Sequence, residues 1–345
     1  MSDEPERQPG ELMAAEVAEQ PAALARILAA RSEFVDAAAR IAAAGPRFVL
    51  IAARGTSDHA ALYAKYLAEV LLALPSGLVS PSSLTVYGAR PEMHDVLFLA
   101  VSQSGRSPDL VDSLHAARER GALTVAVTNA PDSPLAGAAE ISVDVRAGAE
   151  RAVAATKSYT AQLLALYLLI AGDRAAEAAA RLPEAAARTL ALTSADRLAG
   201  VAAPLQYAER LVLTARGYSY ATAREAALKL METSYLSALA FSGADLLHGP
   251  LAMIDRSVPV IAVASPGRGG AAMAPVLERL DQLGAHVLRV GGADDELPIA
   301  SAGIAEELLP VLEILPLQRL AWRLALDRGV DPDRPRGLSK VTQTL

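Results

Sequence analysis

The chain has 345 residues, a net charge of −7, 52% hydrophobic but only 4% aromatic residues, and no cysteine. Lack of cysteine excludes disulfides, Cys-ligated metals and thiol nucleophiles, and the acidic balance argues against nucleic-acid binding. The longest apolar run, near residues 163–171, is far shorter than the roughly 20 residues of a membrane-spanning helix. The N-terminal MSDEPERQPGEL lacks the basic and apolar regions of a signal peptide, so we expect a soluble, cytoplasmic protein without a membrane partner.

In chain order, residues 1–12 are expected to be disordered and Met13 to Ala44 to be helical, with Pro21 near a helix start or a kink. A buried strand, residues 48–53, leads into a polar turn and then a helix from Asp58 to about Ala73. Further apolar strands, separated by helices, are predicted at residues 95–102, 123–127 and 141–143. Continuous apolar strands that alternate with helices predict a parallel sheet covered on both faces.

After an Ala-rich helical connector, residues 174–199, the same pattern begins again. Three segments repeat in the same order: 211–219 resembles 49–57, 258–265 resembles 95–102, and 284–290 resembles 121–127. We therefore predict an internal duplication that gives an α/β fold with two tandem doubly wound parallel-sheet domains. The predicted boundaries are 13–173 for the first domain, 200–330 for the second, and 331–345 for a C-terminal tail.

Polar side chains follow two strands of the first half. Gly55-Thr56-Ser57 follows one strand, and Ser102-Gln103-Ser104-Gly105-Arg106-Ser107 follows the other. Open α/β sheets bind ligands at this edge, where hydroxyls, backbone N–H groups and helix N-termini can hold a phosphate. The equivalent turn of the second half is only Ser265-Pro266-Gly267. Neither a dinucleotide fingerprint nor a Walker lysine is present, so we expect a small phosphorylated ligand; a well-capped loop is the alternative.

The segment from Glu225 to Pro250 carries a second candidate site. Glu225, Lys229 and Glu232 are spaced i, i+4 and i, i+3 on a predicted helix, so their charges share one side. A solvated ladder of ion pairs would have the same spacing. Here, however, the helix leads on to His248 in a loop, and a carboxylate near a histidine and a lysine is suited to moving protons on carbon.

The other histidines are weaker candidates for a functional site. His59 is interpreted as a residue that decorates a helix start, and His94, His115 and His286 lie without obvious partners. Because none of the His, Asp and Glu residues has metal-ligand spacing, we expect neither a metal nor another cofactor.

Two further segments could complete a pocket. The backbone of loop 147–157 could line its far side, and Lys157 could be either a surface lysine or a ligand contact. Pro and Gly residues deny the tail a regular element, and a frayed end is the simplest expectation. Leu338 and Val341 nevertheless give the tail something to bury, so it could fold over a site and deliver Lys340.

From about residue 25 to the end, the chain resembles the double sugar isomerase (SIS) domain proteins. The motifs that carry the resemblance are Gly55-Thr56-Ser57, Ser102-Gln103-Ser104-Gly105, Ala154-Ala155-Thr156-Lys157, Glu225-Ala-Ala-Leu-Lys229-Leu-Met-Glu232, His248-Gly249-Pro250 and Leu338-Ser339-Lys340. The chain is similar to the isomerase half of glucosamine-6-phosphate synthase and to the stand-alone SIS-type glucosamine-6-phosphate deaminases. The resemblance implies two SIS domains with flavodoxin-like topology and a small-molecule sugar phosphate as ligand.

The resemblance also implies binding roles. The sugar phosphate would be bound by Thr56, Ser102, Gln103, Ser104 and Ser107. The rest of the substrate would contact Gly55, Ser57, Val153, Ala154 and Ala155.

It implies four catalytic roles as well. Glu232 would carry the proton between C1 and C2, and Lys229 would assist near the hydroxyls. His248 would open the pyranose ring, reaching the pocket from the partner subunit of a homodimer. Lys340 would engage the sugar carbonyl.

The sequence departs from the synthase at several points. It lacks the cysteine nucleophile of a glutaminase domain, Gly337 stands where the synthase usually has Asn, and Arg106-Ser107 replaces an acidic residue and a Thr. These changes favour the stand-alone branch, so we expect conversion of glucosamine 6-phosphate to fructose 6-phosphate and ammonia. The alternatives are a deglycase, deaminase or isomerase for another sugar 6-phosphate, such as that of galactosamine or a glycated amino acid, and a non-catalytic sugar-phosphate sensor.

Overall fold

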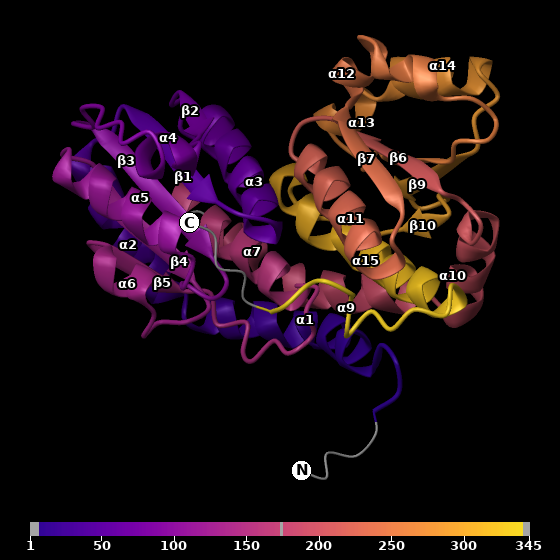
Figure 1. The fold of residues 1–345 in the computed structure, drawn as a ribbon, viewed down its shortest axis with the longest axis horizontal. Coiled ribbons are helices and arrows are strands. Elements are labelled where there is room, and N and C mark those ends of the chain that lie inside the picture. The colour runs from indigo at the N-terminus through magenta and orange to yellow at the C-terminus, as the bar shows by residue number, and fades with distance from the viewer. Residues whose placement is uncertain (1–6, 173–174, 341–345) are drawn as a thin grey trace.

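The computed structural model describes residues 7–172 and 175–340, which form two α/β halves side by side (Figure 1). Each half is built on a five-stranded parallel sheet. The first sheet contains β1 (Phe48–Ala53), β2 (Ser76–Leu78), β3 (Val96–Ser102), β4 (Leu123–Thr128) and β5 (Ile141–Asp144). The second contains β6 (Arg210–Ala215), β7 (Ser237–Ser242), β8 (Val260–Val263), β9 (Val287–Gly291) and β10 (Leu297–Pro298).

The strand orders of the two sheets confirm the predicted doubly wound fold. The first sheet has the order β2-β1-β3-β4-β5, and the second, taken from its β7 edge, has the order β7-β6-β8-β9-β10. Both are the flavodoxin-like order 2-1-3-4-5, in which the chain changes direction between the first and third strands. The two sheets therefore share one topology, and ligands of such sheets bind at that switch point.

The helices of the first half and the connector cover both faces of the first sheet and link it to the second. They are α1 (Glu11–Ala29), α2 (Arg31–Ala44), α3 (Thr56–Leu71), α4 (Pro81–Thr85), α5 (Pro108–Glu119), α6 (Pro134–Ala138), α7 (Lys157–Ala171), α8 (Ala175–Ala179), α9 (Leu182–Leu192) and α10 (Ala195–Ala202). The second half adds α11 (Ser219–Ser234), α12 (Gly243–Leu247), α13 (Arg268–Ala271), α14 (Ala274–Gln282) and α15 (Leu309–Asp327). Short 3₁₀ turns lie at Ala203–Leu205, Pro250–Met253 and Glu306–Leu308.

One hydrophobic core joins the halves. Helices α3 and α7 of the first half lie against α11 and α15 of the second, between the two sheets (Figure 1). All of α7 except its last residue is buried, which explains its continuous apolar sequence. Since this shared core includes residues of both halves, it fixes the switch point of the first sheet relative to α11.

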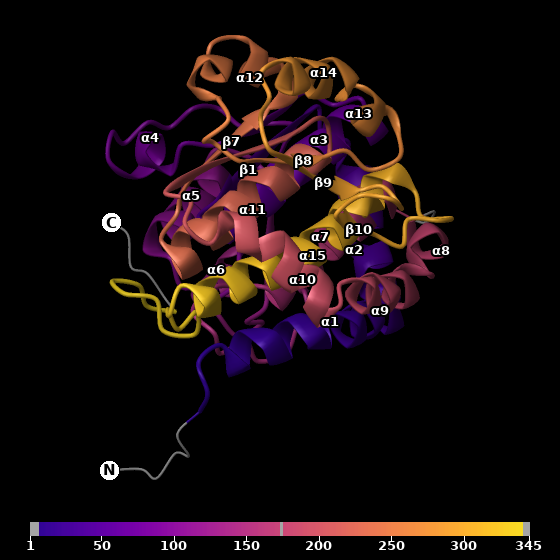
Figure 2. The same cartoon turned by 90° about the vertical axis from the view of Figure 1, so that its right-hand side faces the viewer.

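Helix α1 runs along the base of both halves, where it packs on α7, α9 and α15 (Figure 2). The expectation of disorder is wrong for residues 11 and 12, which are helical. The N–H of Leu12 donates to Asp333 Oδ2 at 2.8 Å, and that of Met13 donates to Asp333 Oδ1 at 2.9 Å. The tail thus satisfies N–H groups that the first turn of a helix leaves unpaired. Residues 1–6 and 341–345 lie outside the described residues, as do 173 and 174.

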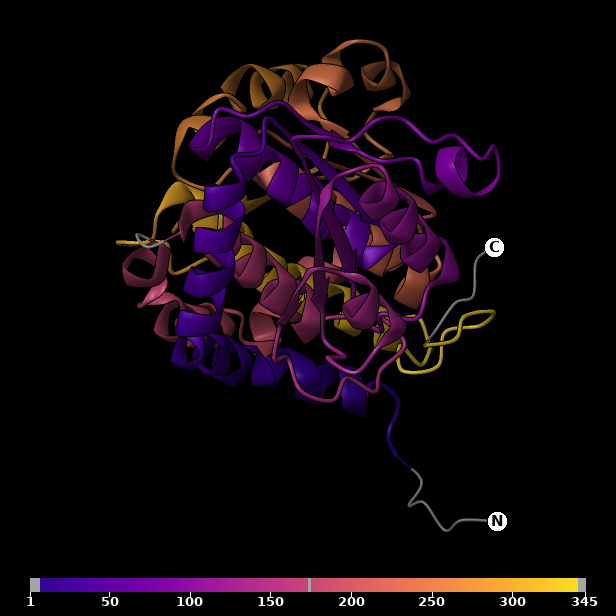
Figure 3. The same ribbon diagram turned by 90° about the vertical axis from the view of Figure 1, so that its left-hand side faces the viewer.

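The predicted helix over residues 13–44 is divided into α1 and α2 at Ala30, and Pro21 lies inside α1. The strands β2, β7 and β10 were not predicted. All three lie at or next to a sheet edge and are short or only partly buried, so they lack the continuous apolar run that identifies β3. The segment around α4, which follows β2, projects from the body of the first half (Figure 3).

Candidate active site

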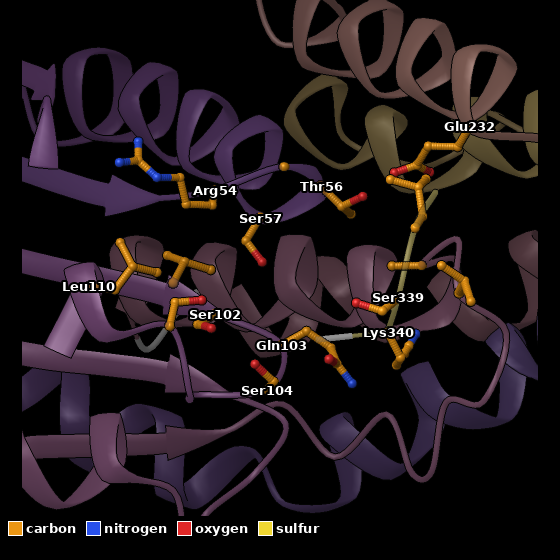
Figure 4. A pocket seen from close by; sticks show the side chains of 16 residues that line it. Arg54, Thr56, Ser57, Ser102, Gln103, Ser104, Leu110, Glu232, Ser339 and Lys340 are labelled. Carbon is orange, nitrogen blue, oxygen red and sulfur yellow. The ribbon is translucent and has the colours of Figure 1, made fainter. Parts of the chain in front are cut away.

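A cavity of about 300 Å³ opens at the switch point of the first sheet, between β1 and β3 (Figure 4). Loops after both strands, one residue of α11 and the end of the tail contribute to it. It is lined by Arg54, Gly55, Thr56, Ser57, Val101, Ser102, Gln103, Ser104, Ser107, Leu110, Val153, Ala155, Glu232, Leu338, Ser339 and Lys340. The structure thus brings together most of the residues that the sequence singled out.

Two helices begin at this cavity. Gly55, with φ 54° and ψ −131°, turns the chain from β1 into α3, and Ser107 stands at the N-cap of α5. Both helices are long enough to carry a macrodipole, whose positive end lies at the cavity. Unpaired N–H groups at helix N-termini are good donors to a phosphate, so this edge of the sheet suits an anion.

The loop that follows β3, residues 102–107, is the serine-rich loop of this cavity, and it is held in a compact turn. Ser102 Oγ accepts from the N–H of Gly105 at 3.1 Å, and Gly105 has φ 61°. A Cβ at Gly105 would lie 2.0 Å from Ser133 Oγ, so both the conformation and the close approach require glycine. The turn leaves the side chains of Gln103 and Ser104 partly exposed along the cavity wall.

Glu232 faces this loop from the other half of the molecule. In Figure 4 it enters the cavity opposite Ser102 and Ser104, on the last turns of α11. Its side chain is 20% exposed, and its Oε2 lies 2.5 Å from Lys229 Nζ. A carboxylate of the second half and the hydroxyls of the first therefore share one cavity.

The charges on α11 share one side of the helix as predicted, but a solvated ladder is the wrong interpretation. Glu225 and Lys229 are fully buried, and Lys229 Nζ lies 3.3 Å from Glu225 Oε1. Burial disfavours the charged lysine, yet the carboxylates of Glu225 and Glu232 outweigh it and raise the pKa of Lys229. Lys229 does not line the cavity; it stays charged beneath it and holds Glu232.

A hydroxyl and an imidazole from α3 complete this buried group. Lys229 Nζ donates to Thr56 Oγ1 at 3.0 Å, and Thr56 Oγ1 donates to Glu225 Oε1 at 3.0 Å. His59 Nδ1 lies 2.7 Å from Glu225 Oε2. The interpretation of His59 as decoration of a helix start was wrong, because the residue is buried against a carboxylate 166 positions away. The pair of His59 and Glu225 could not be predicted from the sequence, because the two residues lie far apart along the chain.

The tail ends at the cavity. Lys340 Nζ donates to Glu150 Oε2 at 2.9 Å and to the carbonyl of Ala152 at 2.7 Å. Burial would raise the pKa of Glu150, but Lys340 and two hydrogen bonds from Ser158 lower it overall. The expected burial of Leu338 is wrong, since this residue lines the cavity but is 47% exposed. Val341 lies outside the described residues.

Some candidate residues lie elsewhere. Ala154 is buried and does not line the cavity, although its neighbours Val153 and Ala155 do, and Lys157 is buried in an ion pair with Glu19 at 2.6 Å. Lys157 is therefore neither a surface lysine nor a contact of this cavity. His248 is exposed at the end of α12 and does not line the cavity within one chain.

The second sheet has an equivalent switch point, but carboxylates of the same chain occupy it. Glu306 accepts hydrogen bonds from the N–H groups of Arg268 at 2.9 Å and Gly269 at 2.7 Å, in the turn after β8. The buried Glu313 accepts from Ser219 Oγ at 2.8 Å, at the start of α11. The donors that would face an anion there are already satisfied, which explains how the two halves differ in spite of their common topology.

The lining residues that the sequence did not mark as site residues include Arg54, Val101, Leu110 and Ser339. The Arg54 Nε donates to the buried Asp109 Oδ2 at 2.8 Å, and Figure 4 shows the guanidinium directed away from Glu232. The position of Arg54 beside Gly55 was a signal that could have identified it. Leu110 is an ordinary core residue of α5 with no such signal.

A model of the SIS domain family matches residues 44–172 and 205–294. The chain belongs to this family. A curated relative from Methanothermobacter thermautotrophicus, named glutamine–fructose-6-phosphate aminotransferase (isomerizing), is 36% identical over 303 residues, covering 85% of this chain and 51% of the relative. A relative of the same name from Thermococcus kodakarensis is 32% identical over 345 residues, covering 95% and 57%. This SIS chain spans about half the length of such curated relatives.

Solved structures show the same double SIS architecture. A protein from Silicibacter pomeroyi DSS-3, assigned as a phosphosugar isomerase, superposes with a TM-score of 0.81 at 35% identity, covering 93% of this chain and 99% of the other. Glucosamine-6-phosphate deaminase from Thermotoga maritima has a TM-score of 0.76 at 21% identity, covering 97% and 100%, which shows a common fold.

Neither a metal-binding cluster nor a membrane-spanning helix is present among the described residues. Within residues 7–172 and 175–340, His, Asp and Glu side chains form no group of three or more that could hold a metal ion. Over the same part of the chain, no helix is both long and apolar enough to cross a membrane.

Proposed function

We propose that this SIS protein converts glucosamine 6-phosphate to fructose 6-phosphate and ammonia. The observation that carries the proposal is the meeting of Glu232 with the serine-rich loop in one cavity, opposite each other (Figure 4). The loop and two helix N-termini suit a phosphate, and the carboxylate suits proton transfer on carbon. The names of the curated relatives, isomerizing aminotransferases for fructose 6-phosphate, support a hexose 6-phosphate as ligand.

In the proposed reaction the phosphate is held by the loop after β3 and by Thr56. The sugar then extends toward Glu232. After ring opening, Glu232 removes the proton from C2 of the amino aldehyde and returns it at C1. The resulting C2 imine takes up water, expels ammonia and leaves the ketone of fructose 6-phosphate. Proton transfer of this kind contributes about 100- to 10,000-fold to the rate.

Lysine residues would serve this reaction in two ways. Because its pKa is raised, Lys229 remains an ammonium at neutral pH, so it does not act as a base and instead holds the side chain of Glu232 in place through their ion pair. Lys340 lies at the cavity with its ammonium on Glu150 and on the carbonyl of Ala152, from which it could turn to the sugar carbonyl. A cation near that oxygen would stabilise the negative charge that develops on it.

His248 is proposed to open the sugar ring from a partner subunit. Within one chain it does not line the cavity, yet it is exposed beside the exposed Leu247 and near the outer strand β7, where Leu239 is 49% exposed. An apolar surface around an exposed histidine fits a homodimer in which the imidazole reaches the other chain. A mixed dimer made from His248→Ala and Glu232→Gln chains should regain about a quarter to a half of wild-type turnover, whereas each parent dimer should be inactive.

The test compares turnover of four compounds, each with its own readout. Ammonia release reports glucosamine 6-phosphate and galactosamine 6-phosphate, freed amino acid reports a fructosyl amino acid 6-phosphate, and fructose 6-phosphate reports isomerisation of glucose 6-phosphate. Glu232→Gln should lower kcat by about 100- to 10,000-fold with the affinity for a hexitol 6-phosphate retained. Glu278→Gln, on the exposed face of α14, is the matched control.

Three outcomes would contradict the proposal. Faster turnover of another compound in the panel would reassign the substrate. Binding without turnover of any compound would make the protein a sugar-phosphate sensor. Wild-type ammonia release by Glu232→Gln would remove the proton carrier.

A further inference from the structure

The hydroxyl of Thr56 belongs to two systems. It lines the cavity beside the serine-rich loop, and it also bonds to the buried charges of α11. Its oxygen accepts from Lys229 Nζ at 3.0 Å, and its proton goes to Glu225 Oε1 at 3.0 Å. Glu225 and Lys229, which are 169 and 173 positions from Thr56 in the sequence, thus both contact one side chain of the proposed phosphate site.

A hydroxyl carries only one proton. If Thr56 donates to an anion in the cavity, it can no longer donate to Glu225 Oε1. Glu225 is fully buried, and an unsatisfied buried carboxylate oxygen is costly, so another donor must move toward it. The nearest is Lys229 Nζ, which lies 3.3 Å from Glu225 Oε1, slightly beyond the usual hydrogen-bond distance.

Movement of Lys229 toward Glu225 also affects Glu232. The same ammonium holds Glu232 Oε2 at 2.5 Å. A shift toward Glu225 lengthens that contact and frees the carboxylate that faces the sugar. The other oxygen of Glu225 is fixed by His59 at 2.7 Å, so Glu225 itself cannot follow the proton of Thr56.

We propose that Thr56 couples anion binding in the first half to release of Glu232 in the second, with Glu225 and His59 as positioning residues. The inference deepens the proposed function and rests on it, because it takes Thr56 as a phosphate donor and Glu232 as the proton carrier. Phosphate binding would then switch on the base, in addition to holding the substrate.

The first test is structural and needs no turnover. Crystals of the wild-type protein are compared without ligand and with inorganic phosphate. We expect phosphate within hydrogen-bond distance of Thr56 Oγ1, a shorter Lys229–Glu225 contact and a longer Lys229–Glu232 contact. Phosphate on Thr56 with both contacts unchanged would overturn the coupling. Phosphate bound away from Thr56 would overturn it too, whichever substrate the protein uses.

The second test separates kcat from KM. Thr56→Val should lower kcat by about 10- to 100-fold as well as raise KM, because it removes one hydrogen bond to a charged group of the switch. Thr56→Ser keeps the hydroxyl and should recover most of kcat. Ser104→Ala removes a hydroxyl of the same cavity outside the network and should act chiefly on KM. Equal effects of Thr56→Val and Ser104→Ala on kcat would refute the coupling.

His59 is tested by His59→Asn and His59→Ala. Asparagine can still bond to Glu225 Oε2, so it should retain more of kcat than alanine while both keep their affinity for inorganic phosphate. The matched control is His94→Asn, since the side chain of His94 is 77% exposed. Equal kcat for both His59 variants and wild type would show that His59 does not position Glu225.

Failure of this inference can be told from failure of the proposed function. If no amino-sugar phosphate is turned over, the proposed function is wrong and kcat cannot be compared between variants. The crystal structure with inorganic phosphate still shows whether the two contacts of Lys229 change. If turnover is present and the contacts do not change, the function stands and the coupling is wrong.

Discussion

Replacement of Lys229 by methionine would test whether the buried charges of α11 depend on one another. Lys229 has no exposed surface, and its ammonium contacts the carboxylates of Glu225 and Glu232 at 3.3 and 2.5 Å. Methionine fills a similar volume but leaves Glu225 without its nearest cation in the interior. Breaking a buried pair in this way costs about 3–5 kcal/mol. We expect urea unfolding of Lys229→Met to show a loss of that size.

The matched control is Lys65→Met. Lys65 and Glu69 on α3 form an i, i+4 pair like Glu225 and Lys229, with an N–O distance of 2.6 Å, but both side chains are about a third exposed. Solvent screens such a pair, so its loss should cost less than about 1 kcal/mol. The double variant Glu225→Gln, Lys229→Met should be more stable than Lys229→Met alone, because it leaves no unpaired charge on Glu225.

The contribution of Lys229 to the free energy of unfolding depends on pH in a direction that its pKa decides. The pKa of Lys229 is raised in the folded state above 10.5, so its contribution is complete below that value and is lost only as the pH rises through the folded-state pKa. The difference between wild type and Lys229→Met should therefore stay constant from about pH 6 to 9. A difference no larger than that of Lys65→Met, or one that disappears within this range, would refute the reasoning.

The remaining predictions concern stability. Lys340→Met should cost about 1–3 kcal/mol at pH 7, since it leaves the buried carboxylate of Glu150 without its cation. The lowered pKa of Glu150 means that this loss should shrink as the pH falls below 4.5, which thermal unfolding across acid pH would detect. Asp333→Ala removes acceptors from the first turn of α1 and should cost about 0.5–2 kcal/mol in urea unfolding. Glu306→Ala frees the N–H groups of Arg268 and Gly269 and should cost about 1–3 kcal/mol, with unchanged affinity for inorganic phosphate by calorimetry.

Much of the fold could be predicted because its strongest signals are local. The strand β3 is buried along all seven residues, and its apolar run stands out in the sequence. The duplication was visible because the strands β1 and β6 end in the same Ala-Arg-Gly turn. The edge strands β2 and β7 gave no such signal, since their residues are only partly buried and tertiary pairing decides their conformation.

The site divides along similar lines. The loop residues Ser102 and Ser104 could be identified because hydroxyls after a strand have a known use. The burial of Glu225 and its contact with His59 could not, because α11 shows the same charge spacing as a solvated helix. For Lys340, the tail could be predicted to fold over a site. Its pairing with Glu150 could not be predicted, because the two residues lie far apart in the sequence.

The most direct measurement is a crystal structure of the Glu232→Gln protein with glucosamine 6-phosphate. We expect the phosphate to lie on the loop from Ser102 to Ser107 and on Thr56, with C1 and C2 within about 3–3.5 Å of the side chain at position 232. A phosphate bound at any other place, or a sugar whose C1 and C2 point away from that side chain, would contradict it.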